Sequence, residues 1–160
     1  MATTGTGRTK LERIKETSRG LRGTIARELR DGTPRVSPDT AQLLKFHGIY
    51  QQDDRDARHA LKARGEDRRT IFMVRTKNPG GGPLTPEQWA VLDRASDLHG
   101  DGTLRLTTRQ DVQFHGVGKD HLRRLIRLLH TELVDTFGAC GDGTRNTCAC
   151  PVSALRRGGD

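Results

Sequence analysis

Hydrogen-bond donors alternate with apolar residues within positions 104–117 of this 160-residue chain. In a β-strand, successive side chains face opposite ways, so residues of one parity share a face. The apolar parity comprises Leu104, Leu106, Val112 and Phe114. The donor parity comprises Arg105, Thr107, Arg109, Gln113 and His115. A tight turn through residues 110–111 would bring these donors together, and arginine forks suit anions that offer two oxygens, such as carboxylate, phosphate or sulfur oxyanions.

Two further segments could extend this donor face. In the strand-like run 71–77, Arg75 and Lys77 have one parity while Phe72 and Val74 have the other. If this run pairs with the other two strands, the sheet has one apolar and one cationic face. The glycine-rich segment 138–146 ends in Arg145-Asn146, and such a loop can bring backbone amides close to an anion.

The same pattern is also typical of an ordinary solvated sheet face, on which arginine and threonine are common. A lone histidine such as His115 more often makes a structural hydrogen bond than it binds a ligand. Arg123, Arg124 and Arg127 fit the solvated face of a helix better than a binding site. From the pattern alone, a solvated sheet and an anion site both remain open.

The elements that would position these donors begin at residue 70. The run 71–77 ends at the turn 78–82, and a helix with Thr85 as its cap, Pro86 next and Gln88 in the first turn extends to about residue 98. Strands 103–108 and 112–117 follow, and then a helix over 119–134. This order predicts an α+β fold with a ferredoxin-like half-domain of β-α-β-β-α order.

The periodicity within the two helices predicts which residues face the core. The inner face of the first helix is predicted to carry Trp89, Leu92 and Ala95. The inner face of the second is predicted to carry Leu122, Leu125, Ile126, Leu129 and Leu133.

The first 69 residues give weaker signals. Residues 11–29 have helical character interrupted by Gly20 and Gly23, and Gly32, Pro34 and Pro38 predict a linker. Residues 51–69 are polar and predict a loop with a short helix. We therefore expect an extended, partly helical segment over 1–40, a polar loop segment over 41–69, the half-domain over 70–137, and the start of a further domain over 138–160.

The composition indicates an anionic partner. The chain has 28 basic and 20 acidic residues, a formal charge of +8, which suits nucleic acid, a membrane surface or a polyanionic small molecule. Aromatic residues make up only 4%, few for a protein that stacks single-stranded bases. No apolar run approaches the roughly 20 residues of a membrane helix, and residues 1–10 lack the apolar stretch of a secretion signal. We expect a cytoplasmic protein without a membrane partner.

Three cysteines, Cys140, Cys148 and Cys150, lie near the C-terminal end. An odd number without a secretion signal argues against a disulfide framework. The Cys-x-Cys pair could be half of a metal site, but the spacing matches no standard zinc pattern, so we favour reduced structural thiols over metal ligands.

Four blocks of the sequence, in order, resemble the sirohaem-dependent nitrite/sulfite reductase family, above all the N-terminal part of the sulfite reductase haemoprotein (beta) component. KFHGIYQQDDRD (45–56) is similar to a block near the start of those haemoproteins. MVR (73–75) with PGG (79–81) resembles the strand of the substrate arginine. LRLTTRQ (104–110) with QFHG (113–116) resembles the sirohaem-facing hairpin, and RN (145–146) before CP (150–151) resembles an Arg-Asn segment of the site. The agreement extends from about residue 18 to residue 151.

The resemblance implies a role for the donor face. Sirohaem is an iron tetrapyrrole ringed by carboxylates, and the positions that match its binding residues are Arg105, Thr107, Arg109, Gln113, His115 and Asn146. Arg75 and Arg145 match the arginines that hold sulfite or nitrite. The chain would then be the N-terminal fragment of an assimilatory sulfite reductase, which reduces sulfite to sulfide with six electrons. Reduction of nitrite to ammonia is the closely related alternative. A different kind of function, a non-catalytic basic module that binds nucleic acid or an acidic partner, is also considered. The resemblance disfavours nucleic acid as a partner.

The resemblance also implies what lies outside these residues. Family members hold a 4Fe-4S cluster through Cys-x5-Cys and Cys-x3-Cys motifs far downstream, a spacing that the three cysteines of this chain do not have. The paired active-site lysines are also downstream, and Thr147 departs from the aliphatic residue of relatives. The expected partners are the remainder of the reductase polypeptide and an electron donor, either an NADPH flavoprotein or ferredoxin. Alone, the chain should neither hold sirohaem tightly nor reduce sulfite.

Overall fold

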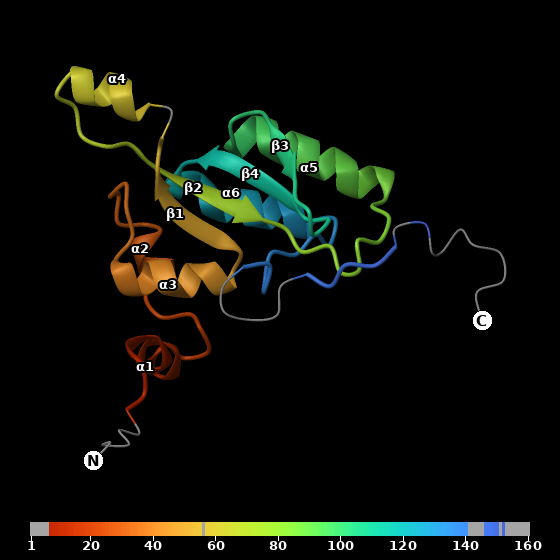
Figure 1. Cartoon of the computed structure of the whole chain (residues 1–160), viewed down its shortest axis with the longest axis horizontal. Coiled ribbons are helices and arrows are strands. Elements are labelled where there is room, and N and C mark those ends of the chain that lie inside the picture. Colours follow the sequence, from red (N-terminus) through yellow and green to blue (C-terminus); the bar gives the residue numbers. More distant parts are fainter. Residues whose placement is uncertain (1–6, 56, 141–145, 151, 153–160) are drawn as a thin grey trace, which may run out of the picture.

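Four antiparallel strands form one sheet with the order β1-β2-β4-β3 in the computed structural model, which describes residues 7–55, 57–140, 146–150 and 152. The strands are β1 (Ile49–Asp53), β2 (Thr70–Arg75), β3 (Leu104–Leu106) and β4 (Val112–Val117). Helix α5 (Pro86–His99) connects β2 to β3, and α6 (Lys119–His130) follows β4. Figure 1 shows both helices on one side of the sheet. The predicted β-α-β-β-α half-domain is therefore confirmed.

Strand β1 was not expected, because residues 51–69 read as a loop with a short helix. It pairs with β2 at the edge of the sheet, with Ile49 opposite Val74 and Asp53 opposite Thr70. The alternation of apolar and polar residues fails in this strand. Gln51 is polar, yet it lies on the core side of the sheet, opposite the buried Phe72. The Gln51 amide is satisfied there, because its oxygen accepts from the Val36 backbone N–H at 2.7 Å and its nitrogen donates to the Val36 carbonyl at 3.4 Å.

The core lies between the sheet and the helices. Its fully buried sheet residues are Phe72, Val74, Phe114 and Val117. Its buried helix residues include Leu92, Ala95, Leu122, Leu125 and Leu129.

Three apolar residues predicted on the core side are exposed. Trp89 is 47% exposed, because the buried stripe of α5 is centred roughly a quarter of a turn away from it at 100° per residue. Leu133 is 88% exposed because α6 ends at His130 and helical spacing no longer applies. Leu106 is 73% exposed at the end of the short edge strand β3.

Among the described residues up to position 69, the structure has four helices: α1 (Lys10–Thr17), α2 (Ile25–Glu28), α3 (Pro38–Phe46) and α4 (Arg58–Ala63). Pro38, expected in a linker, is the first residue of α3. The Ser37 hydroxyl accepts from the Thr40 N–H at 3.3 Å, and proline is favoured next to such a cap because the first helical N–H needs no partner.

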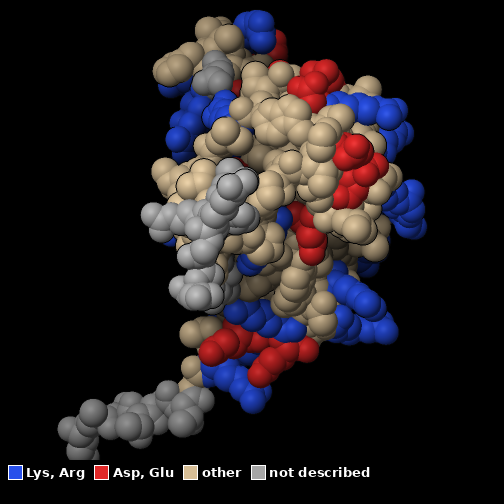
Figure 2. Space-filling model, turned by 90° about the vertical axis from the view of Figure 1, so that its right-hand side faces the viewer, with Lys and Arg blue, Asp and Glu red and all other residues tan. Residues whose placement is uncertain are grey.

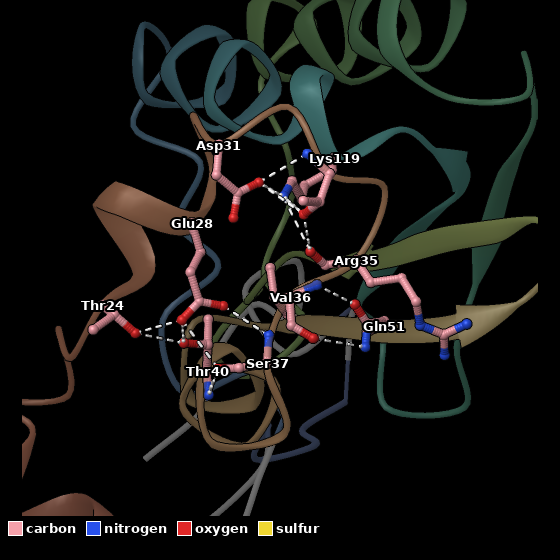
Figure 3. A network of polar contacts seen from close by, with 10 residues as sticks. Thr24, Glu28, Asp31, Arg35, Val36, Ser37, Thr40, Gln51 and Lys119 are labelled. Atoms are coloured by element: carbon pink, nitrogen blue, oxygen red, sulfur yellow. Dashed lines mark hydrogen bonds and ion pairs between the residues drawn. The ribbon is translucent and has the colours of Figure 1, made fainter.

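The buried carboxylate of Glu28 connects α2 to the start of α3 (Figure 3). It accepts hydrogen bonds from the hydroxyls of Thr24 (2.5 Å), Thr40 (2.7 Å) and Ser37 (3.0 Å), and from the Ser37 N–H (2.7 Å). Burial alone would raise the pKa of Glu28, but these hydrogen bonds outweigh it and lower the pKa to about 2.

A second buried charge, Lys119, joins the N-terminal segment to the half-domain (Figure 3). Its ammonium group donates to Asp31 Oδ1 (2.5 Å), Thr33 Oγ1 (2.8 Å) and the Arg35 carbonyl (3.0 Å). These three bonds use all three donors of the ammonium group. The N-terminal segment is thus tied by specific polar contacts to the first turn of α6.

Gly48, just before β1, is expected to tolerate alanine far less well than Gly65. Both glycines have positive φ, 76° and 69°. A Cβ at Gly48 would lie 2.5 Å from the Thr136 carbonyl oxygen and 2.6 Å from that of Arg75, whereas one at Gly65 meets nothing within 4 Å. Gly65→Ala should cost about 1–2 kcal/mol of stability for its left-handed backbone. Gly48→Ala should cost about 1–3 kcal/mol more, because backbone atoms must move. Urea unfolding measures both, and equal losses would contradict this packing.

Candidate functional site

One row of polar residues crosses three neighbouring strands. Arg105 of β3 lies directly opposite Gln113 of β4, and Gln113 lies opposite Arg75 of β2. The backbone N–H of Arg75 donates to the Gly48 carbonyl at 2.8 Å. This bond connects Arg75 to the residue that precedes the edge strand β1. The predicted convergence of Arg75, Arg105 and Gln113 on one face is therefore what the structure shows.

Gln113 connects two of the predicted site residues. With its amide oxygen toward β2, it accepts from Arg75 Nε at 2.8 Å and also from Arg75 Nη2. The other end of the amide lies 3.3 Å from His115 Nε2. Burial lowers the pKa of His115, as do the nearby charges of Arg105 and Arg75, while Asp101 opposes them. Burial and the two arginines thus favour the neutral form of the His115 imidazole.

The donor face is less polar than its sequence predicted. Met73 and Ile71 share the parity of Arg75 on β2, and Met73 is only 7% exposed. Tyr50 of β1 lies opposite Met73, which places a partly buried aromatic ring on the same face. The face thus combines arginine donors with apolar side chains. This combination suits a ligand with an apolar body and charged substituents.

A hollow of about 620 Å³ opens beside His115 at one end of this face. Its lining includes Arg105 and two arginines that the sequence did not single out, Arg55 and Arg69. Asp101 also lines it. Burial would raise the pKa of Asp101, but hydrogen bonds from Thr103 and the charges of Arg105 and His115 outweigh this and lower it. The hollow thus combines three arginines with three carboxylates, since Asp53 and Asp54 line it as well as Asp101.

Two predicted cofactor-binding residues, Thr107 and Asn146, shape the turn that carries Arg109. The Thr107 hydroxyl accepts from the N–H groups of Asp111 (3.1 Å) and Arg109 (3.3 Å). Asn146 donates to the carbonyls of Asn78 (2.6 Å) and Arg109 (2.7 Å). Arg109 itself is exposed. Thr107 and Asn146 therefore position the backbone of Arg109.

Asp111 is a residue that the sequence placed only in a turn. It is 1% exposed, and its Oδ1 accepts from the Asn78 N–H at 3.0 Å. Burial raises its pKa, although that hydrogen bond and the cations Arg75, Lys77 and Arg109 oppose the rise. Asp111 thus fixes the turn after β2 next to the turn of Arg109.

Lys77 and Arg145 complete the predicted cationic set. The Lys77 ammonium donates to the Gly138 carbonyl at 3.4 Å, so its side chain is directed toward residue 138. Arg145 lies outside the described residues.

Other features of the described residues do not form an anion site. A second hollow, of about 390 Å³, has an apolar lining that includes Leu29, Leu44 and Ile126, with Arg123 and Arg127 beside them. Cys140 is buried and Cys148 and Cys150 are exposed, and none of the three forms a disulfide. Among the described residues, no helix is long and apolar enough to cross a membrane, and no three His, Cys, Asp or Glu side chains are grouped as metal ligands would be.

Known proteins resemble this chain in sequence. Residues 63–131 match the model of the nitrite/sulfite reductase ferredoxin-like half domain. The beta subunit of sulfite reductase [NADPH] from Saccharomyces cerevisiae is 48% identical over 145 residues, which are 90% of this chain and 10% of that protein. The sulfite reductase [NADPH] hemoprotein beta-component of Staphylococcus haemolyticus is 45% identical over 142 residues, 88% of this chain and 25% of that protein. The chain thus spans a quarter or less of these two relatives.

A solved structure shows the same fold. The NirA protein of Mycobacterium tuberculosis superposes with a TM-score of 0.72 and 20% sequence identity. The match covers 89% of this chain and 27% of that structure. The likeness therefore includes most of the N-terminal segment as well as the half-domain.

Proposed function

We propose that this chain, which carries the ferredoxin-like half domain of nitrite and sulfite reductases, supplies the arginine side of a sirohaem and substrate site in a sulfite reductase. The observation that carries the proposal is the row Arg105–Gln113–Arg75, with the partly exposed Ile71 and Tyr50 on the same face. Sirohaem has a tetrapyrrole body and peripheral carboxylates, and these residues offer both an apolar surface and anion donors. The donor set therefore fits the cofactor.

Each residue has a distinct part in the proposed site. Arg105 and Arg109 would bind carboxylates of sirohaem through paired N–H donors, with Thr107 and Asn146 holding the Arg109 turn. His115 would act as a neutral hydrogen-bond donor, and Gln113 would link Arg75 to His115. The residues toward the substrate anion would be Arg75 and Arg145. When bound, sirohaem supplies the redox chemistry, and the arginines bind and polarise the anion.

Sulfite is the substrate we favour, because the two relatives above are named sulfite reductases. Nitrite is the alternative, since the same arginines suit either anion. The complete reaction is six-electron reduction to sulfide, with a 4Fe-4S cluster bound by the remainder of the polypeptide and electrons from an NADPH flavoprotein or ferredoxin. We place this reaction in the cytoplasm and expect the chain alone to be inactive.

A different kind of function would be that of a basic module that binds nucleic acid. The formal charge of +8 would favour such binding. On the face shown in Figure 2, however, acidic and basic side chains are interspersed around uncharged residues, without a continuous basic stripe. That function predicts binding that weakens steeply with salt and does not depend on the residues of the donor face.

Titration of this chain with iron-free sirohaem is expected to show weak, saturable binding at the donor face. The side-chain Nε–H resonances of Arg75, Arg105 and Arg109 should shift in ¹⁵N-correlated NMR spectra, because their guanidinium groups meet the carboxylates. Those of Arg123 and Arg127, on the helix that packs against the opposite face, should not. Shifts confined to Arg123 and Arg127, or no shift at any arginine, would contradict the proposed face.

A further inference from the structure

We infer that Gln113 is a positioning residue that couples the orientation of Arg75 to the protonation state of His115. The inference deepens the proposed function, because it concerns how the substrate arginine is held in the proposed site. It rests on the contacts of one side-chain amide that bridges two functional residues on adjacent strands.

The orientation of the Gln113 amide follows from its neighbours. Arg75 has only donors, so the end of the amide near its Nε and Nη2 must be the oxygen. The nitrogen end then lies 3.3 Å from His115 Nε2. A primary amide nitrogen can only donate, so His115 Nε2 must accept. The neutral imidazole therefore carries its proton on Nδ1.

The bridge has consequences for both neighbours. It occupies two N–H groups of Arg75 and leaves the remaining N–H groups of the guanidinium for a ligand. A proton can join His115 Nε2 only if the Gln113 amide turns over, because two donors would otherwise face each other. Turning the amide would place its NH2 group against Arg75 and break that contact. Protonation of His115 and the hydrogen bonds from Arg75 to the Gln113 oxygen therefore oppose each other.

The charges around His115 act in both directions. Arg105 on β3 and Arg75 on β2 disfavour a positive imidazole, and burial does so too. Asp101, in the connection between α5 and β3, favours it. Arg55, Arg69, Asp53 and Asp54 line the same hollow from the segment of β1 and the segment before β2. The surroundings are thus mixed, and the amide is the group that contacts Nε2 directly.

The first test is the tautomer of His115 in the cofactor-free chain. Long-range ¹H–¹⁵N spectra at pH 7.5 should show His115 with a protonated Nδ1 and an unprotonated Nε2. The result requires no substitution and does not depend on sirohaem binding. A His115 that carries its proton on Nε2 would overturn the inference while leaving the proposed function untouched.

The second test is Gln113→Glu, whose carboxylate can accept from both neighbours at once. It should preserve the Arg75 contact and raise the pKa of His115 above its ordinary 6.5, because Nε2–H now has an acceptor. The matched control is Gln52→Glu, which adds the same charge on exposed β1 residue Gln52 in the same hollow. It should raise the pKa of His115 by clearly less. Equal rises in the two variants, or no rise in Gln113→Glu, would overturn the coupling.

These tests separate the two levels of the proposal. If the tautomer and the Gln113→Glu result are as expected but iron-free sirohaem does not shift the Nε–H resonances of the donor-face arginines, the coupling stands and the proposed function fails. If the arginines respond to the ligand but the tautomer is reversed, only the coupling fails.

Discussion

Replacing Glu28 with glutamine is expected to lower the free energy of unfolding at pH 7 by about 1–3 kcal/mol, because buried donors of its network would lose their acceptor. The two carboxylate oxygens accept four hydrogen bonds from Thr24, Ser37 and Thr40. Glutamine keeps only one acceptor oxygen, and its NH2 group would face donors in a buried site. Chemical unfolding of the two proteins measures the difference.

The pH dependence of the same variant gives an independent readout. Because folding lowers the pKa of Glu28, its stabilisation is fully present above about pH 4.5 and is lost as the pH falls toward 2. The unfolding free energy of the wild type should fall through this range, and that of Glu28→Gln should fall less. Glu66→Gln is the matched control, since Glu66 is exposed and pairs only with Arg64 among the described residues; it should cost under about 0.5 kcal/mol. A Glu28→Gln loss equal to that of the control would contradict the structural role of the network.

The half-domain could be predicted from the sequence because its signals are local. The capping box of Thr85 and Gln88 marks the start of α5, and both hydrogen bonds are present, at 3.1 and 3.2 Å. Strand β4 was predicted with its observed bounds, since the tight turn at residues 110–111 precedes it and apolar and polar residues alternate at its start. Local propensity, pattern and packing agree over this region, which is the condition under which such predictions succeed.

The N-terminal segment could not be predicted in the same way because its stability comes from distant polar partners. Charged residues are usually solvated, yet Glu28 and Lys119 are buried and hydrogen-bonded. Lys119 meets Asp31 across 88 positions of sequence, and Gln51 meets Val36 across 15. Hydrophobic periodicity carries no information about such contacts, so β1 and the linker around Pro38 were misassigned.

The candidate site was predicted in its main row and incompletely at its ends. Strand parity was sufficient to place Arg75, Arg105 and Gln113 on one face. It could not show that Thr107 and Asn146 hold a turn, because that depends on backbone groups of residues 78 and 109. Asp111 was missed as a buried carboxylate, since a single acidic residue in a turn is usually solvated.

Replacing Arg105 and Arg109 together with alanine is expected to remove most of the sirohaem from the proposed reductase, assembled from this chain and the remainder of its polypeptide. Each charge-assisted contact to a carboxylate contributes about 1.5–3 kcal/mol, so two losses correspond to a hundredfold or greater fall in affinity. Both side chains are exposed in this chain, so their removal should leave the core intact. Arg123→Ala with Arg127→Ala removes the same charge from α6 and serves as the control.

The decisive quantity is the sirohaem absorbance per polypeptide after this chain is produced together with the remainder of its reductase and purified by gel filtration. The wild type and the Arg123/Arg127 control should retain sirohaem alike, while the Arg105/Arg109 variant should retain roughly a tenth or less. Full sirohaem content in the Arg105/Arg109 variant, or an equal loss in the control, would contradict the assignment of the donor face as the sirohaem site.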